Sequence, residues 1–333
     1  MTVLAVGAYT VDLYMFGDHL PGPGESVGAS GYATAHGGKA ANVAVASARL
    51  GAPTRFVGGL GDDADSLAAL AALRADGIET GGCAAIDGVA TGRSFVYVDK
   101  RGGQIVMTWP GAADLLPPSR AADAAAGLRP GSVLVLQGEI PVATSAAAAA
   151  AAPPGVRVLL NPSPAGPFLS EIGEELLRRA DVLVLNDGEL AALTGPADEA
   201  RPAAAGSDEG VSPAESLLPR TRGRTVVVTL GERGAEIAGD HGTMLIGVPR
   251  VNAVDTTGAG DAFTGALAAA LRAGASVAQG VRLACRVAAV SVTRRFCAPS
   301  YPSASELGIA PLQGSSGQEN PGETTPHPGS PGT

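Results

Sequence analysis

The stretch Asp255-Thr256-Thr257-Gly258-Ala259-Gly260-Asp261 runs directly into a helical pattern that continues to residue 272. Backbone N–H groups at a helix start have no partner inside the helix, and the helix dipole adds partial positive charge there. Such a corner attracts anions, phosphate in particular. A carboxylate on the first turn repels a phosphate, but it can take the proton from a hydroxyl that attacks one. The stretch therefore favours phosphoryl transfer to an alcohol, with Asp261 as the base.

Two other interpretations of the same residues must be weighed. An aspartate at a helix start complements the helix dipole, so Gly258-Ala259-Gly260 could be an ordinary tight turn. A dinucleotide-binding loop of the Gly-x-Gly-x-x-Gly type needs glycine or alanine at the position of Phe263, and it follows the first strand of its domain. Here the motif lies near the C-terminal end. The residues alone leave the phosphate site and the tight turn as alternatives.

Composition limits the classes of protein to consider. The chain has 333 residues, 45% of them hydrophobic, which is enough for a large core in one or two domains. The formal net charge of −9 argues against a nucleic-acid partner, because nucleic-acid binders normally carry a basic face. No apolar run reaches about 18 residues and no signal peptide precedes the first apolar segment, so we expect a cytoplasmic protein without a membrane partner.

Short apolar segments alternate with helical patterns along the chain. We expect strands at residues 3–8, 54–58, 132–137, 157–161, 182–186 and 225–230, followed by a hairpin of 235–238 and 243–248. We expect helices at residues 39–50, 63–76, 144–152, 170–179, 188–193, 260–272 and 277–294. The alternation predicts an α/β fold whose mostly parallel central sheet is covered on both faces.

Two segments interrupt this rhythm. Residues 13–36 and 92–109 are extended, with Gly and Pro turns, and predict a small β-sheet that protrudes from the α/β body as a lid. Residues 195–213 are polar and predict a surface insertion. Residues 313–333 are largely Gly, Ser, Pro, Thr and Glu, which predicts a disordered C-terminal tail after a folded domain of residues 1–312.

A second glycine loop, Gly37-Gly38-Lys39, opens the helix expected at residues 39–50. Lys39 and Asn42 are three residues apart and share a helical face, which suits a ligand with hydroxyls or phosphate. The alternative is a glycine loop that caps a helix beside a solvated lysine. The chain does not match the nucleotide-binding pattern Gly-x-x-x-x-Gly-Lys-Ser/Thr, because Ala40 follows the lysine.

Polar residues also follow the expected strands, and in an open α/β sheet one crevice collects such strand ends. Asp12 could accept hydrogen bonds from sugar hydroxyls, although a turn residue explains it equally well. Asn186 and Glu189 could hold a hydrated Mg²⁺, although a helix cap with an acidic first turn explains them equally well. The residues at these strand ends are Asp12, Glu139, Asn186, Glu189, Thr229 and Gly231.

In this order the motifs resemble the ribokinase-like (PfkB) family of carbohydrate and nucleoside kinases, and most closely its ribokinases. The resemblance extends from about residue 3 to residue 312. It implies a ribokinase-like three-layer α/β/α sandwich with a mostly parallel central sheet, and a small protruding β-sheet lid through which members often form homodimers. The motifs are Asp12-Leu13, Pro21-Gly22-Pro23-Gly24-Glu25-Ser26-Val27, Gly37-Gly38-Lys39 with Asn42, residues 58–63, Gln137 with Glu139, Asn161-Pro162, Asn186 with Glu189, Thr229-Leu230-Gly231 and residues 255–261.

The resemblance also implies a role for each matching residue. Asp261 corresponds to the catalytic base that takes the proton from a primary hydroxyl, and Gly258, Ala259 and Gly260 correspond to the anion hole. The sugar site comprises Asp12, Gly38, Lys39, Asn42, Glu139 and Asp261. The ATP contacts comprise Asn186, Thr229, Gly231 and Gly260. Asn186 and Glu189 correspond to the Mg²⁺ site, through water, and Asp255, Thr257, Ser291 and Arg294 to a monovalent-cation site that usually holds K⁺.

The reaction implied is ATP-dependent phosphorylation of D-ribose to D-ribose 5-phosphate. Another pentose, fructose or a nucleoside are the alternative acceptors, and a sugar- or nucleotide-binding regulator without catalysis is disfavoured because Asp261 and its glycine corner are intact. An aspartate with an ordinary pKa of about 4 is a weak base, so positioning and charge stabilisation are expected to supply most of the rate.

Five positions depart from the family pattern. Thr10 and Ala113 stand where ribokinases usually have asparagine, and Ala40 stands at a glycine position; these three bear on ribose specificity. Phe296 stands at a glycine position near the cation loop, and Cys285 stands where a histidine often lines the adenine site.

Overall fold

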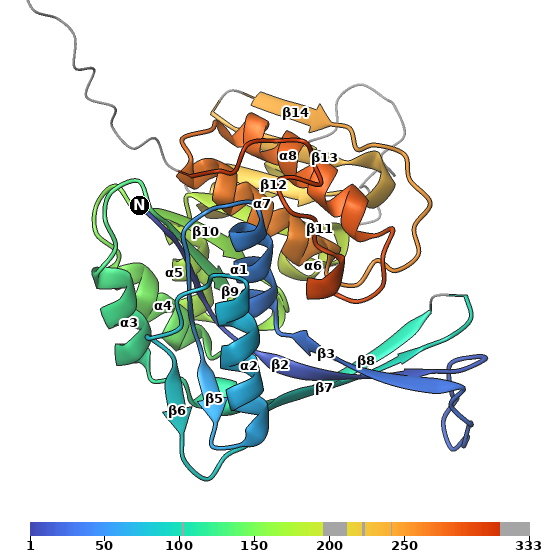
Figure 1. Cartoon of the computed structure of the whole chain (residues 1–333). Helices are drawn as coiled ribbons and strands as arrows, with labels where there is room; N and C mark the ends of the chain where they lie inside the picture. Colours follow the sequence, from blue (N-terminus) through green and yellow to red (C-terminus); the bar gives the residue numbers. More distant parts are fainter. Residues whose placement is uncertain (102, 196–211, 222–223, 241, 314–333) are drawn as a thin grey trace, which may run out of the picture.

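A large sheet lies at the centre of the computed structural model of this chain (Figure 1). Apolar runs without polar alternation form the middle of this main sheet. Strands covered on both faces have this pattern, whereas strands with one solvated face alternate. The sheet order is β14-β13-β12-β11-β10-β9-β1-β4, and the strands from β12 to β4 are parallel. These are β1 (Val3–Val6), β4 (Thr54–Val57), β9 (Val133–Gln137), β10 (Arg157–Asn161), β11 (Val182–Asn186) and β12 (Thr225–Thr229). The hairpin of β13 (Ala235–Gly239) and β14 (Gly242–Ile246) adds antiparallel strands at one edge.

The structure describes residues 1–101, 103–195, 212–221, 224–240 and 242–313. Residues 196–211 of the expected surface insertion and residues 314–333 of the expected tail lie outside these ranges. Within them, no helix is both long and apolar enough to cross a membrane.

Two hydrophobic cores lie on opposite faces of the main sheet. Val3 and Ala5 of β1 belong to one core, and Leu4 and Val6 belong to the other, because successive side chains of a strand point to opposite faces. The first core also contains residues of α1 (Lys39–Arg49), α2 (Ala64–Ala75), α7 (Ala259–Arg272) and α8 (Val277–Ser291). The second contains residues of α3 (Pro118–Ala126), α4 (Val142–Ala151), α5 (Glu171–Arg179) and α6 (Asp187–Thr194). The expected three-layer α/β/α sandwich is confirmed.

A second sheet protrudes from this body (Figure 1). Its order is β3-β2-β7-β8, formed by β2 (Thr10–Phe16), β3 (Gly31–Gly37), β7 (Thr91–Val98) and β8 (Gln104–Gly111). The strands overlap the expected segments 13–36 and 92–109. Asp12, Tyr14 and Ser94 are buried on one face, while Met15 and Phe95 are exposed on the other.

Some elements were not expected from the sequence. Helix α3 begins at Pro118 and buries only alanines, namely Ala121, Ala124 and Ala125, so no large apolar side chain marks its buried face. The short strands β5 (Gly59–Gly61) and β6 (Ala84–Ile86) form a third sheet, and three-residue strands carry almost no pattern. Short 3₁₀ turns complete the chain: η1 (Ala112–Leu115), η2 (Gly166–Leu169), η3 (Glu215–Thr221), η4 (Gly231–Arg233) and η5 (Ala298–Ser300).

Candidate active site

The starts of α1 and α7 meet at the carboxyl end of the parallel strands. Asn42 on the first turns of α1 donates its side-chain N–H to Asp261 Oδ2 at 2.9 Å. The backbone N–H of Lys39 donates to Glu139 Oε2 at 2.7 Å, and Glu139 lies just beyond β9. These pairs are 219 and 100 residues apart in sequence. The fold therefore brings together four of the expected sugar-site and catalytic residues.

One position of the glycine loop before α1 accepts only glycine. Gly38 has φ of 89°, and a Cβ there would lie 2.5 Å from the carbonyl oxygen of Ala8 and 2.6 Å from Cα of Tyr9. Backbone atoms cannot move aside as the end of a flexible side chain can. This close approach fixes the loop against the end of β1, so that Lys39 begins the helix beside Glu139.

Buried charges give the site unusual electrostatics. Burial raises the pKa of Asp12 to about 6 and that of Glu139 to about 7. Burial also raises the pKa of Asp261, which is 6% exposed, against the opposing effects of Lys39 and Asn42. Burial alone would lower the pKa of Lys39, but the carboxylates of Asp261 and Glu139 raise it. Lys39 therefore stays positively charged among three carboxyl groups. The expectation of an ordinary pKa for Asp261 is wrong, because the side chain of Asp261 is buried.

The start of α7 leaves two backbone donors free. Gly258 caps the helix with φ of 76°, and the N–H of Ala259 donates to the carbonyl of Thr256 at 3.2 Å. The N–H groups of Gly260 and Asp261 have no acceptor within the described ranges. A side chain added at Gly260 would meet no atom within 4 Å, so the corner faces open space. This geometry suits an anion.

Asn186 and Glu189 form a reciprocal cap at the start of α6. Asn186 Oδ1 accepts from the N–H of Glu189 at 2.8 Å, and Glu189 Oε2 accepts from the N–H of Asn186 at 2.9 Å. Thr229 ends β12, and its hydroxyl donates to the carbonyl of Leu185 at 3.4 Å, while Gly231 follows with φ of 57° in open surroundings. In the part of the chain that the structure describes, no three His, Cys, Asp or Glu side chains are close enough to hold a metal ion by themselves.

Asp255 joins the two loops of the expected cation site. Its Oδ1 accepts from the N–H of Thr257 at 2.9 Å and its Oδ2 from the N–H of Phe296 at 2.8 Å. Phe296 adopts φ of 69° and packs edge-on against Tyr14, with ring centroids 5.0 Å apart. The positive φ explains why glycine suits this position.

The side chains of Ser291 and Arg294 are engaged elsewhere. The hydroxyl of Ser291 donates to the carbonyl of Ala288 at 2.9 Å, and the guanidinium of Arg294 pairs with Glu306 at 2.8 Å. Any contribution of these two residues to a cation site would come from their backbone.

The other departures from the family pattern are accommodated without strain. The hydroxyl of Thr10 donates to Asp12 Oδ1 at 2.8 Å and so orients that carboxylate. The methyl group of Ala40 lies against Gly7, and a Cβ added at Gly7 would come within 2.7 Å of this methyl group. Ala113 is fully buried and Cys285 is 3% exposed in the core.

Sequence reasoning missed Tyr301, whose hydroxyl donates to the carbonyl of Gly258 at 3.0 Å. No motif marks this tyrosine, since it lies in the irregular segment after the last helix. Only the tertiary fold places it behind the glycine corner.

The sequence is similar to those of known carbohydrate kinases. Residues 2–304 match the family described as pfkB family carbohydrate kinase. A ribokinase of Haemophilus influenzae is 31% identical over 92% of this chain and 96% of its own. A deoxyribokinase of Salmonella typhi is 32% identical over 91% of this chain and 96% of its own.

Solved structures show the same fold. Ribokinase from Thermotoga maritima has a TM-score of 0.80 at 30% identity, with 92% of this chain and 98% of that chain covered. Arabidopsis thaliana ribokinase, solved with ribose and ATP, has a TM-score of 0.75 at 28% identity, with 92% of this chain and 97% of that chain covered. The chain belongs to the pfkB family of carbohydrate kinases.

Proposed function

We propose that this protein transfers the γ-phosphoryl group of ATP to a primary hydroxyl of a small sugar, with D-ribose to D-ribose 5-phosphate as the leading reaction. The observation that carries the proposal is the buried Asp261, bonded to Asn42, beside two unpaired N–H groups at the start of α7. A base and an anion site next to each other are what phosphoryl transfer to an alcohol requires.

In the proposed reaction Asp261 takes the proton of the attacking hydroxyl. The hydroxyl oxygen forms a bond to the γ-phosphorus as the bond from phosphorus to the β,γ-bridging oxygen breaks, and ADP leaves. The free N–H groups of Gly260 and Asp261, together with Gly258 and Ala259 as the frame of the corner, would stabilise the charge on the transferred group. The raised pKa of Asp261 makes it a better base than an exposed aspartate.

Ribose is proposed as the acceptor on two grounds. Asp12, Lys39, Asn42 and Glu139 offer both acceptors and donors at one site, which suits a compact molecule with several hydroxyls. The Haemophilus influenzae relative is a ribokinase. The deoxyribokinase relative has similar identity, so deoxyribose is the first alternative, followed by fructose and nucleosides.

Mg²⁺ is proposed to enter with ATP. Because no cluster of three acidic or nitrogen ligands occurs within the described ranges, the phosphate oxygens and water would supply most of its ligands, which is usual for Mg²⁺. Asn186 and Glu189 would orient such waters from the start of α6, and Thr229 and Gly231 would contact the nucleotide. When bound, Mg²⁺ neutralises phosphate charge.

A monovalent cation, K⁺, is proposed for the loops that Asp255 joins. Each Asp255 oxygen accepts one N–H and keeps a further lone pair. The carbonyls near Thr257, Ser291 and Arg294 would complete the site.

A homodimer is proposed to form through the outer face of the lid. The exposed side chains of this face come from all its strands, and monomers rarely expose so contiguous an apolar surface. A second copy would cover it. The exposed side chains of this face are Met15, Tyr32, Phe95, Ile105, Met107 and Trp109.

The proposal is tested by ADP release with Mg·ATP and K⁺ across ribose, deoxyribose, other pentoses, fructose and nucleosides. Ribose should be the best acceptor, and Asp261→Asn should lower turnover by about a thousandfold while ATP still binds. Strong turnover on a different acceptor would reassign the substrate. Unchanged turnover in the variant would remove Asp261 from its role, and no turnover on any acceptor would favour a binding protein.

A further inference from the structure

The carbonyl of Gly258 is held from two sides. The N–H of Ala262 donates to it at 2.9 Å as the first bond of α7. The hydroxyl of Tyr301, which is 2% exposed, donates to it at 3.0 Å. This carbonyl and the N–H of Ala259 belong to one planar peptide unit, so its direction sets the path of the corner that leads to Gly260.

Tyr301 also lies in van der Waals contact with the corner. A Cβ at Gly258 would lie 2.6 Å from the Tyr301 hydroxyl and 2.9 Å from Cys297 Sγ. The glycine and the tyrosine therefore fit one another closely. The hydroxyl occupies the space that any other residue at position 258 would need for its side chain.

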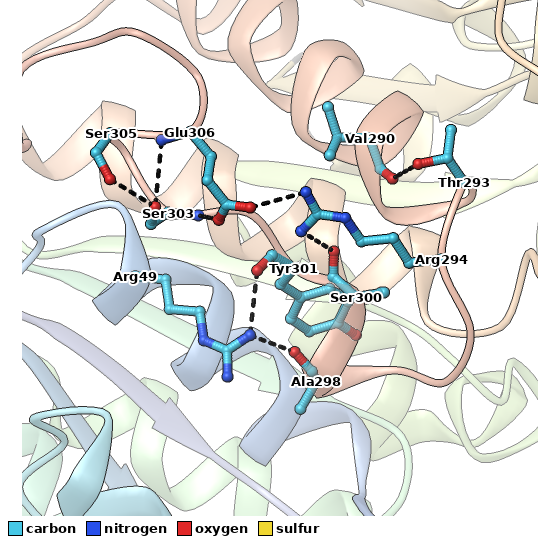
Figure 2. A network of polar contacts seen from close by, with 10 residues as sticks. All are labelled: Arg49, Val290, Thr293, Arg294, Ala298, Ser300, Tyr301, Ser303, Ser305 and Glu306. Carbon is cyan, nitrogen blue, oxygen red and sulfur yellow. Dashed lines mark hydrogen bonds and ion pairs between the residues drawn. The ribbon is translucent and has the colours of Figure 1, made fainter.

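The segment that carries Tyr301 is itself fixed (Figure 2). Arg49 donates to the carbonyls of Ala298 and Tyr301 at 2.5 and 3.1 Å. Arg294 donates to the carbonyl of Ser300 at 3.4 Å. Arg49 ends α1, and Asn42 lies near the start of the same helix. Helix α1 therefore both fixes the segment that carries Tyr301 and bonds Asp261.

We propose that Tyr301 is a positioning residue for phosphoryl transfer. Its hydroxyl fixes the Gly258 peptide so that the free N–H groups of Gly260 and Asp261 face the transferred group. The proposal rests on the proposed kinase function. Small displacements of groups that stabilise a transition state reduce the rate strongly while substrate binding changes less.

The test is Tyr301→Phe, which keeps the ring and removes only the hydroxyl. We expect kcat to fall about tenfold, while KM for sugar and for ATP changes by less than about twofold. Amide hydrogen exchange of residues 256–262 should become faster, because the carbonyl of Gly258 loses one of its two donors.

Ser300→Ala is the matched control. Ser300 is fully buried in the same segment, and its hydroxyl donates to the carbonyl of Cys297 at 2.7 Å rather than to Gly258. This variant also loses one buried hydroxyl-to-carbonyl bond, and it should change neither kcat nor exchange at residues 256–262.

The exchange measurement decides on Tyr301 even if the wild-type protein phosphorylates none of the acceptors, because it does not require turnover. In that case faster exchange in Tyr301→Phe alone would support the anchoring of the corner while the kinase function fails. Unchanged exchange, equal changes in Ser300→Ala, or a raised KM with unchanged kcat would each overturn the positioning role.

Discussion

At the scale of single residues, the site combines charges that the fold alone would not favour. Asp12, Glu139 and Asp261 are carboxyl groups whose pKa values burial raises, so each is easier to ionise in the unfolded chain than in the native one. Groups of this kind lower stability at neutral pH and are typical of functional sites. The protein therefore gives up stability at this cluster, which the proposed sugar site would explain.

The stability lost by burying a carboxyl group can be measured at Glu139. Its pKa is about 7 in the folded protein against an ordinary 4.5, so its contribution to stability is present below pH 4.5 and is lost as pH rises towards 7. Glu139→Gln keeps an acceptor for the N–H of Lys39. In urea denaturation, we expect the free energy of unfolding of the variant to exceed that of wild type by about 2 kcal/mol at pH 8. At pH 4.5 the two should differ little.

Glu25→Gln is the control for that experiment. The N–H of Gly22 and the His19 side chain lower the pKa of Glu25, which has the opposite sign. This variant should gain no stability as pH rises. An equal gain in both variants would show that net charge, and not the buried position of Glu139, is responsible.

Gly38→Ala tests the close approach of the glycine loop to β1. Gly274 is the matched control, since its φ of 91° is close to the 89° of Gly38 and a Cβ there would meet no atom within 4 Å. Gly274→Ala should cost about 1 kcal/mol, the price of the left-handed backbone. Gly38→Ala should cost about 3 kcal/mol or more in urea denaturation, because its Cβ meets backbone atoms of residues 8 and 9. Equal costs would contradict the contact.

At the scale of elements, the sequence predicts what has a local signal. Strands β9, β10, β11 and β12 are continuous apolar runs, and α8 begins with the reciprocal cap of Ser276 and Gln279. Helix α3 was missed because its buried face consists of alanines, with no large apolar side chain to mark it, although Pro118 at its start was a usable signal.

The candidate site divides in the same way. Its glycines, Lys39 and Asp261 stand in recognisable motifs. The hydrogen bonds from Asn42 to Asp261 and from Tyr301 to Gly258 join segments that only the packing of α1, α7 and η5 brings together. Burial of Asp261, and hence the direction of its pKa shift, likewise follows from tertiary packing.

The outer face of the lid sheet is exposed in the part of the chain that the structure describes. Phe95 and Met107 are paired across β7 and β8 and are 50% and 66% exposed. Met107→Glu places a charge at the centre of the proposed dimer interface. We expect light scattering to give twice the 32.8 kDa chain mass for wild type and the monomer mass for the variant.

Leu245→Glu is the control for the lid, because Leu245 is 63% exposed on β14, the edge strand of the main sheet. It should leave the mass unchanged. A wild-type monomer, or a dimer that survives Met107→Glu, would contradict assembly through this face.

At the scale of the whole molecule, Arg49 joins parts of the chain that lie far apart in sequence. Its guanidinium bonds Asp76 at the end of α2, at 3.1 Å, and the carbonyls of Ala298 and Tyr301 in the C-terminal segment. Arg49→Met keeps much of the aliphatic stem but leaves the carboxylate and both carbonyls without this donor. We expect the free energy of unfolding to fall by about 3 kcal/mol, because hydrogen bonds to charged groups are among the stronger ones.

Arg55→Met is the matched comparison, because Arg55 makes a single ion pair at 3.3 Å with Glu79, which is 64% exposed. Such a pair contributes about 1 kcal/mol or less. Urea denaturation of both variants should therefore separate a junction of three segments from a surface pair. If the two variants lose the same free energy, the C-terminal segment depends on its apolar contacts and not on Arg49. A larger loss in Arg49→Met would show that one side chain couples the helix bearing Lys39 and Asn42 to the segment behind the glycine corner.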